Sequence, residues 1–186
     1  MPSPAKANRG PSAGPENRRA LIDAAREVFA SEGISAPLSS VARKAGVGQG
    51  SLYRHFPDRI ALAAAVFEEN IGELEVALND QARTLDDLLE LVVEQALVST
   101  ALIDTITAHP HDERVAHLGE RLRALVERVV EREKSAGRLG AHVDVDDVVL
   151  AISMMAGVLA RSEPGDRADV GRRAWALFHA AFSAGS

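Results

Sequence analysis

Apolar residues recur every three or four positions along most of the chain, which is the spacing of helices with one buried face. The first stretch of this kind predicts a helix over residues 17–32. Gly33 ends it, because glycine adopts the left-handed backbone after a helix without steric cost. The buried face of this helix consists of Leu21, Ile22, Ala25, Val28 and Phe29. The chain is therefore expected to begin with an amphipathic helix.

Two short helices are predicted within residues 38–56, LSSVARKAGVGQGSLYRHF. Leu38, Val41 and Ala42 give the first of them a buried side, and Gly46 stands where that helix must stop. Leu52 and Phe56, four positions apart, anchor the second helix. Two short helices joined by a glycine-containing turn form a helix-turn-helix, which places its second helix in the major groove of DNA.

The remaining apolar patterns are also helical, and no segment alternates like a strand for long. Further helices are predicted over residues 58–81, 84–108, 111–135, 144–160 and 166–182. Gly119 could divide the third of these, which brings the total to about nine. The sequence therefore predicts an all-α fold, with an N-terminal three-helix helix-turn-helix domain followed by a C-terminal helical domain.

The second short helix carries groups that a DNA duplex can bind. Gln49, Ser51 and Arg54 offer an amide, a hydroxyl and a guanidinium to base edges. Gly50 allows the helix to approach the groove closely, because it has no side chain. Arg54 is the expected reader of a guanine, whose two major-groove acceptors match a guanidinium.

Ala42, Ala45-Gly46-Val47, Leu52-Tyr53 and His55-Phe56, followed by Asp58-Arg59 and Leu62, resemble the DNA-binding domain of the tetracycline-repressor (TetR) family. The resemblance covers residues 17–65. It departs from the family where Pro37-Leu38-Ser39 replaces a phosphate-binding threonine, and where Arg59 replaces the usual lysine.

The resemblance, together with the chemistry of the side chains, assigns roles to the remaining residues of this segment. Hydroxyl, imidazole and guanidinium groups would bind phosphate oxygens, which carry no base sequence but fix the register of the protein on DNA. The phosphate-binding residues are predicted to be Ser39, Ser40, Tyr53, His55 and Arg59, with Arg43 or Lys44 adding a flanking contact.

Charge is distributed unevenly along the chain. Residues 1–60 hold nine Lys and Arg against five Asp and Glu, whereas the rest of the chain holds twelve against twenty-two. A basic head on an acidic body indicates that only the head meets the DNA polyanion, although uneven solvation charge is the alternative. We expect a disordered arm over residues 1–15, a DNA-binding domain over 16–62 and a helical ligand-binding and dimerisation domain over 63–186.

The run VVLAISMMAGVLA in the helix over residues 144–160 is apolar almost all round. A helix that is apolar on every side is buried on every side. A monomer could bury it, but a two-fold dimer built on the last two helices explains it more simply, and the family resemblance implies the same. The predicted dimer interface consists of Ile152, Met155, Leu159, Trp175, Phe178 and Phe182.

The resemblance also implies an effector pocket in the C-terminal domain, with DNA and an unidentified small molecule coupled through a conformational equilibrium. The candidate lining residues, which could equally be core, are Phe67, Ile71, Leu97, Ile103, Ile106, Leu122, Met154 and Met155. One Trp and one Tyr provide no obvious aromatic cage for a planar cation. We expect a ligand-responsive repressor that binds a palindromic operator in double-stranded DNA. The alternative is a helical protein–protein adaptor, or an activator without an effector response.

Several classes of function lack support in the sequence. The chain has no cysteine, no N-terminal apolar signal segment and no long apolar run, so we expect a cytoplasmic protein without a membrane span. No nucleophile elbow, phosphate-binding loop or dinucleotide fingerprint occurs, so no enzyme, catalytic residue or cofactor is predicted. His109, His111 and His117 lie near acidic residues, but their spacing matches no established zinc site, and no metal is predicted.

Overall fold

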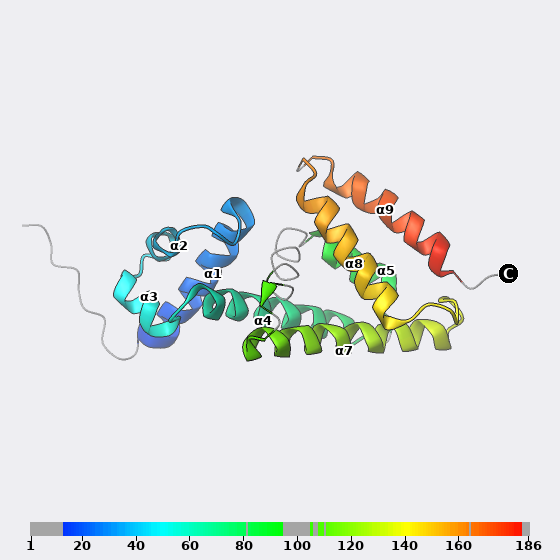
Figure 1. The fold of residues 1–186 in the computed structure, drawn as a ribbon, viewed down its shortest axis with the longest axis horizontal. Coiled ribbons are helices and arrows are strands. Elements are labelled where there is room, and N and C mark those ends of the chain that lie inside the picture. Colours follow the sequence, from blue (N-terminus) through cyan, green and yellow to red (C-terminus); the bar gives the residue numbers. More distant parts are fainter. Residues whose placement is uncertain are drawn as a thin grey trace, which may run out of the picture. The chain divides into compact units, whose positions relative to one another are not determined.

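The structure is a computed structural model that describes residues 13–80, 82–94, 105, 108–109, 111–163 and 165–183. The chain divides between Leu62 and Ala63 into two compact units, each of which has its own core. Every regular element in the described residues is a helix (Figure 1), apart from one isolated antiparallel bridge between Leu139 and Ser183. The predicted all-α fold is confirmed. Within the described ranges, no helix is both long and apolar enough to cross a membrane.

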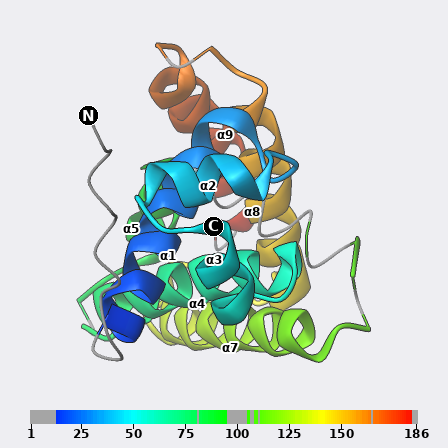
Figure 2. The same ribbon diagram turned by 90° about the vertical axis from the view of Figure 1, so that its left-hand side faces the viewer.

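The first unit contains α1 (Ala13–Glu32), α2 (Leu38–Lys44) and α3 (Gln49–His55), which pack against one another (Figure 2). The predicted apolar face of α1 is confirmed, because all five of its residues are at most 4% exposed. The helix begins four residues before the predicted start at 17. Pro15 is tolerated there, because amides in the first turn have no carbonyl partner inside the helix.

Next in the chain, α4 (Arg59–Leu78) crosses the boundary between the two units, and α5 (Leu85–Glu94) follows it. Asp58 caps α4 by accepting a hydrogen bond of 2.6 Å from the backbone N–H of Ala61. Thr84 and Asp87 form a capping box at the start of α5, in which each backbone N–H donates to the other side chain. The predicted continuation of α5 to residue 108 lies mostly outside the described residues.

The last three described helices are α7 (Glu113–Ser135), α8 (Val145–Ala160) and α9 (Arg167–Phe182). The predicted interruption at Gly119 is absent, since α7 runs through it without a break. Asp144 and Asp147 make a capping box at the start of α8. Asp166 stands at the N-cap of α9, but its side chain makes no capping hydrogen bond.

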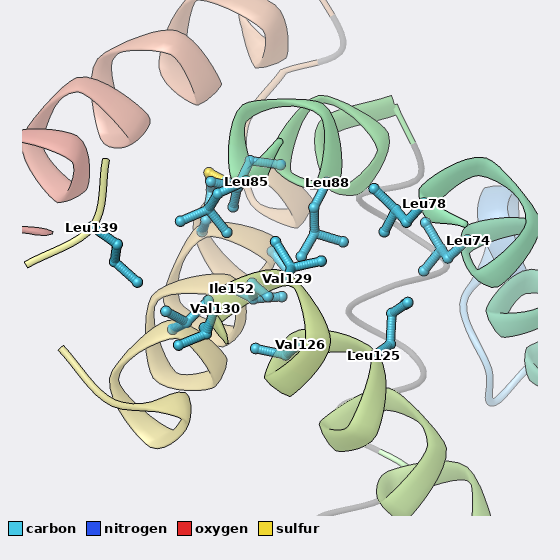
Figure 3. Close-up of a cluster of buried hydrophobic side chains, with 14 of the residues drawn as sticks. Leu74, Leu78, Leu85, Leu88, Leu125, Val126, Val129, Val130, Leu139 and Ile152 are labelled. Carbon is cyan, nitrogen blue, oxygen red and sulfur yellow. The ribbon is translucent and has the colours of Figure 1, made fainter. Parts of the chain in front are cut away.

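Side chains from α4, α5, α7 and α8 form the hydrophobic core of the second unit (Figure 3). Leu88 and Leu125 are at most 1% exposed at its centre, and Leu139 extends it beyond the end of α7. A bidentate ion pair also joins two of these helices: Arg121 of α7 donates to both carboxylate oxygens of Glu75 on α4, at 3.2 and 2.7 Å. This pair lowers the pKa of Glu75, because the Arg121 guanidinium stabilises the ionised carboxylate.

Candidate nucleic-acid interface

The turn between α2 and α3 is fixed by backbone hydrogen bonds around one glycine. Gly46 has φ of +66°, and its N–H donates to the carbonyl of Arg43 at 3.2 Å. The N–H of Val47 donates to the carbonyl of Ala42 at 3.0 Å, which completes a Schellman motif. Only glycine adopts this backbone without strain, so the residue predicted to end α2 is also the one that sets the direction of α3.

One side of α3 holds the helix in the first unit. Leu52 is 1% exposed and Phe56, just past the end of the helix, is 2% exposed. On the first helix of the pair, Val41 and Ala42 are equally buried. The predicted anchors of the helix-turn-helix are therefore confirmed, and they fix which side of α3 faces solvent.

The opposite side of α3 presents a polar stripe, defined here as Gln49, Gly50, Tyr53 and Arg54. These residues are one, four and five positions apart, so they share one face of a helix, and all four are exposed. The side chain of Tyr53 is 54% exposed, a high value for a large aromatic residue. Arg54 Nε donates to the carbonyl of Gly50 at 3.3 Å, which holds the guanidinium along this stripe.

The other residues predicted to bind DNA flank the polar stripe to differing degrees. Ser51 and His55 are half-buried, on the edges of α3. On α2, Ser39 is exposed, and the half-buried Ser40 accepts a long hydrogen bond of 3.5 Å from Arg43. The structure thus brings hydroxyl, imidazole and guanidinium groups of both short helices to the surface of the first unit.

Two of the predicted phosphate contacts are engaged within the protein. Lys44 Nζ forms an exposed ion pair of 2.5 Å with Glu27 of α1. Arg59 Nη1 donates to the carbonyls of Ile34, at 2.6 Å, and of Ala36, in the turn between α1 and α2. Arg59 therefore braces that turn, a role that the sequence did not predict because these partners lie 23 and 25 residues away.

A further contact on this unit joins α1 to the end of the helix-turn-helix. The Arg18 guanidinium of α1 lies 5.4 Å from the centre of the Phe56 ring, within the range of a cation–π interaction. The contact ties a cation to the aromatic anchor that ends the helix-turn-helix. Its only trace in the sequence is the basic pair Arg18-Arg19 on a helix that also carries the buried apolar face.

The structure corrects the predicted dimer interface. Ile152, Met155 and Leu159 are at most 4% exposed within a single chain, where they belong to the core of the second unit. The solvent-facing side of α8 is formed instead by Leu150, Met154 and Val158, which are 59%, 53% and 47% exposed. The other predicted interface residues, which are half-buried against the same core, are Trp175, Phe178 and Phe182.

The predicted pocket residues that the structure describes differ in exposure. Phe67, Ile71 and Met155 are fully buried, whereas Leu122 is half-buried and Met154 faces solvent. Met154 is therefore corrected from a pocket residue to a surface residue. The other members of the set, Leu97, Ile103 and Ile106, lie outside the described residues.

The histidine-rich segment before α7 has a structural role in the part of the chain that is described. Asp112 caps α7 by accepting a hydrogen bond of 3.0 Å from the N–H of Arg114, and it pairs with the guanidinium of the same residue at 2.6 Å. The Arg114 side chain lowers the pKa of Asp112 to about 2. Among the described residues, no group of three or more histidine or carboxylate side chains could hold a metal ion.

The class of protein follows from these features. Two short helices are joined by a turn at a glycine, the second helix presents a polar stripe to solvent, and a separate helical unit follows. This is the architecture of a helix-turn-helix regulator. Residues 21–66 match the sequence model of the bacterial regulatory proteins of the tetR family. The match includes the turn, α3 and the start of α4.

Curated relatives and solved structures agree with this match. The chain is 44% identical over 62 residues to the transcriptional regulator SrpR of Pseudomonas putida, and 37% identical over 83 residues to AcrR of Shigella flexneri. These alignments cover 33% and 42% of this chain but only 29% and 38% of the relatives. The fold also matches a TetR regulatory protein of Rhodobacter sphaeroides with a TM-score of 0.66 and 19% identity, over 89% of this chain and 98% of that one. Residues 21–66 therefore carry a DNA-binding domain of the TetR family of transcriptional regulators, in a chain whose overall fold is similar to that of solved TetR regulators.

Proposed function

We propose that this protein binds a palindromic operator in double-stranded DNA as a homodimer and regulates transcription, with no enzymatic activity. The observation that carries the proposal is the polar stripe of α3, which is exposed while Leu52 and Phe56 bury the other side of the helix. A helix held in this way can enter a major groove without disturbing the core of its own unit.

The residues of the interface divide into two roles. Gln49, Ser51 and Arg54 read base edges, and Gly50 lets the helix backbone approach the groove floor. The groups that bind phosphate oxygens are Ser39, Ser40, Arg43, Tyr53 and His55. Arg59 is reassigned from a phosphate contact to the brace of the turn between α1 and α2. Lys44 contributes less than predicted, because Glu27 already balances its charge.

A dimer is needed because α3 is short. Its seven residues rise only about 10 Å, too little to read an operator alone. The exposed apolar side of α8, formed by Leu150, Met154 and Val158, supports pairing of two chains, because water-exposed apolar stripes of this kind mark interaction surfaces. Leu177 of α9 is 75% exposed and extends the apolar surface offered to a partner. Two such heads would meet two half-sites about one helical turn or more apart.

We further propose that the second unit binds a small effector, and that effector and DNA affinities are coupled, so that the protein acts as a repressor released by its ligand. The support is architectural: α4 belongs to both units and is tied to α7 by the Arg121–Glu75 ion pair. Any ligand whose binding shifts α4 against α7 would change the affinity of the protein for DNA by some factor. DNA binding would then change the affinity for that ligand by the same factor. A cytoplasmic location follows from access to DNA. A transcriptional activator would use the same DNA-binding surface and would differ only in how its binding affects transcription.

Two single substitutions test the assigned roles. Arg54→Ala removes a base contact, so it should cost about 1–3 kcal/mol at one base pair and relax the preference there. Tyr53→Phe removes a phosphate contact, so it should weaken binding about equally on every operator variant. Binding should be measured by fluorescence anisotropy on a panel of operator variants at fixed ionic strength. Identical specificity profiles for the two variants would refute the division into base and phosphate contacts.

A further inference from the structure

The second unit contains a cleft that the DNA-binding role does not use. It lies between α5 and α9, which pack against each other, and it has a volume of about 610 Å³. That volume lies within the range of small-molecule pockets. None of its described lining residues belongs to the pocket predicted from the sequence.

Two contacts join α5 and α9, the two helices that form the walls of this cleft. Trp175 Nε1 of α9 donates to the carboxylate of Asp86 on α5 at 2.6 Å. Further along the same pair of helices, Gly171 lies so close to α5 that an added Cβ would stand 2.8 Å from Val93 Cγ2. The two helices are thus pinned at two points, so the cleft is a fixed feature of the packing and does not depend on one flexible side chain.

The walls combine apolar and aromatic surface with negative charge. Leu89 and Val93 line the cleft beside Trp175, whose ring stacks edge-on with His179 at a centroid separation of 5.5 Å. On the α5 side, Asp86, Glu90 and Glu94 are spaced four residues apart and form one acidic edge.

Within the described residues the negative charge of this edge is only partly offset, by electrostatic interaction of Arg83 with Glu90 and of Arg138 with Asp86. Neither Glu90 nor Glu94 makes an ion pair or hydrogen bond there. The cation on the opposite wall, Arg172, is paired with Asp169 at 3.0 Å. An indole ring face attracts cations, and carboxylates at the rim add Coulombic attraction, so this combination selects positive charge attached to an apolar body.

We propose that the cleft between α5 and α9 binds an organic cation, whose apolar body packs on Val93 and Trp175 and whose charge faces Glu90 and Glu94. This deepens the proposed function, on which it rests for its regulatory meaning, by naming the chemical class of the effector. A dimer paired through Leu177 would leave the cleft accessible. Positions 175 and 177 point about 200° apart around α9, since each residue turns the helix by about 100°.

Trp175 is the only tryptophan in the chain, so its fluorescence reports directly on the cleft. The probes are tetraphenylphosphonium and tetraphenylborate, which have nearly the same shape and opposite charge. Titrated into the full-length protein without DNA, the cation should quench Trp175 saturably, and the anion should not. Equal responses to both ions, or none to the cation, would overturn the proposal.

Variants then locate the charge selectivity. Glu90→Gln and Glu94→Gln should each weaken tetraphenylphosphonium binding by roughly 5- to 10-fold, because each removes one facing charge. Glu131→Gln, an exposed position on α7 away from the cleft, should leave the affinity unchanged. If neither Glu90→Gln nor Glu94→Gln changes the affinity for tetraphenylphosphonium, the proposed site is refuted.

A separate experiment connects the cleft to regulation. Operator affinity is measured first without the cation and then with it. Failure to bind DNA in the first measurement contradicts the proposed function and leaves cation binding intact. If the cation binds but leaves operator affinity unchanged, the effector role is refuted, while DNA binding stands.

Discussion

Replacing Gly50 by alanine should improve the stability of the first unit and harm DNA binding. Gly50 is the second residue of α3, its backbone is not left-handed, and an added Cβ would have no neighbouring atom within 4 Å. The methyl group therefore fits the folded protein without strain. Alanine is also the better helix former, because glycine loses more backbone freedom when it is fixed in a helix.

The expected sizes of the two effects can be worked out. Removing glycine from a helix stabilises it by roughly 0.5–1 kcal/mol. For a unit of about 60 residues this raises Tm by roughly 2–8 °C. The same methyl group would project from the polar stripe towards the base edges that α3 is proposed to contact. Loss of close approach should then weaken operator binding by roughly 10-fold or more, comparable to loss of one good base contact.

Thermal unfolding followed by circular dichroism measures the first effect, and anisotropy titration of a labelled operator measures the second. The matched control is Gly72→Ala, at a position inside α4 where an added Cβ is equally unobstructed. That variant should gain stability and keep its DNA affinity. If Gly50→Ala binds the operator as tightly as the wild type, the close approach of α3 to DNA is refuted.

Two other predictions address the second unit. Asp87 has its pKa lowered to about 2, chiefly because it accepts the backbone N–H of Thr84 and then a hydrogen bond from Arg83. Its contribution is therefore present above the unfolded pKa near 4 and lost as the pH falls towards 2. Asp87→Asn should cost about 1 kcal/mol in urea unfolding at pH 7 and nearly nothing at pH 2, and a constant cost would contradict this. Met154→Glu, at a solvent-facing position of α8, should leave helix content unchanged but yield monomers in sedimentation analysis, whereas an intact dimer would exclude that face.

Local periodicity explains why the helix-turn-helix could be predicted. Leu52 and Phe56 lie on one helical face whatever the rest of the chain does, and Gly46 marks the only kind of residue that turns there without strain. Capping residues such as Thr84 and Asp87 are also local, since their partners lie three residues away.

Tertiary contacts and the faces of uniformly apolar helices could not be predicted in the same way. On α8 almost every residue is apolar, so the pattern cannot distinguish Met155, which faces the core, from Met154, which faces solvent. The bond between Asp86 and Trp175 joins residues 89 positions apart, and only the packing of α5 on α9 brings them together. The sequence thus located the exposed polar stripe of α3 but neither the face of α8 nor the acidic cleft.

The most direct test of the account is selection of DNA by the purified wild-type protein from a random duplex library, at modest salt. The account predicts enriched sequences that contain two inverted half-sites, with protected regions centred about one helical turn or more apart. Enrichment of no sequence at all, or of a single site without an inverted repeat, would contradict the presentation of two copies of α3 to one duplex.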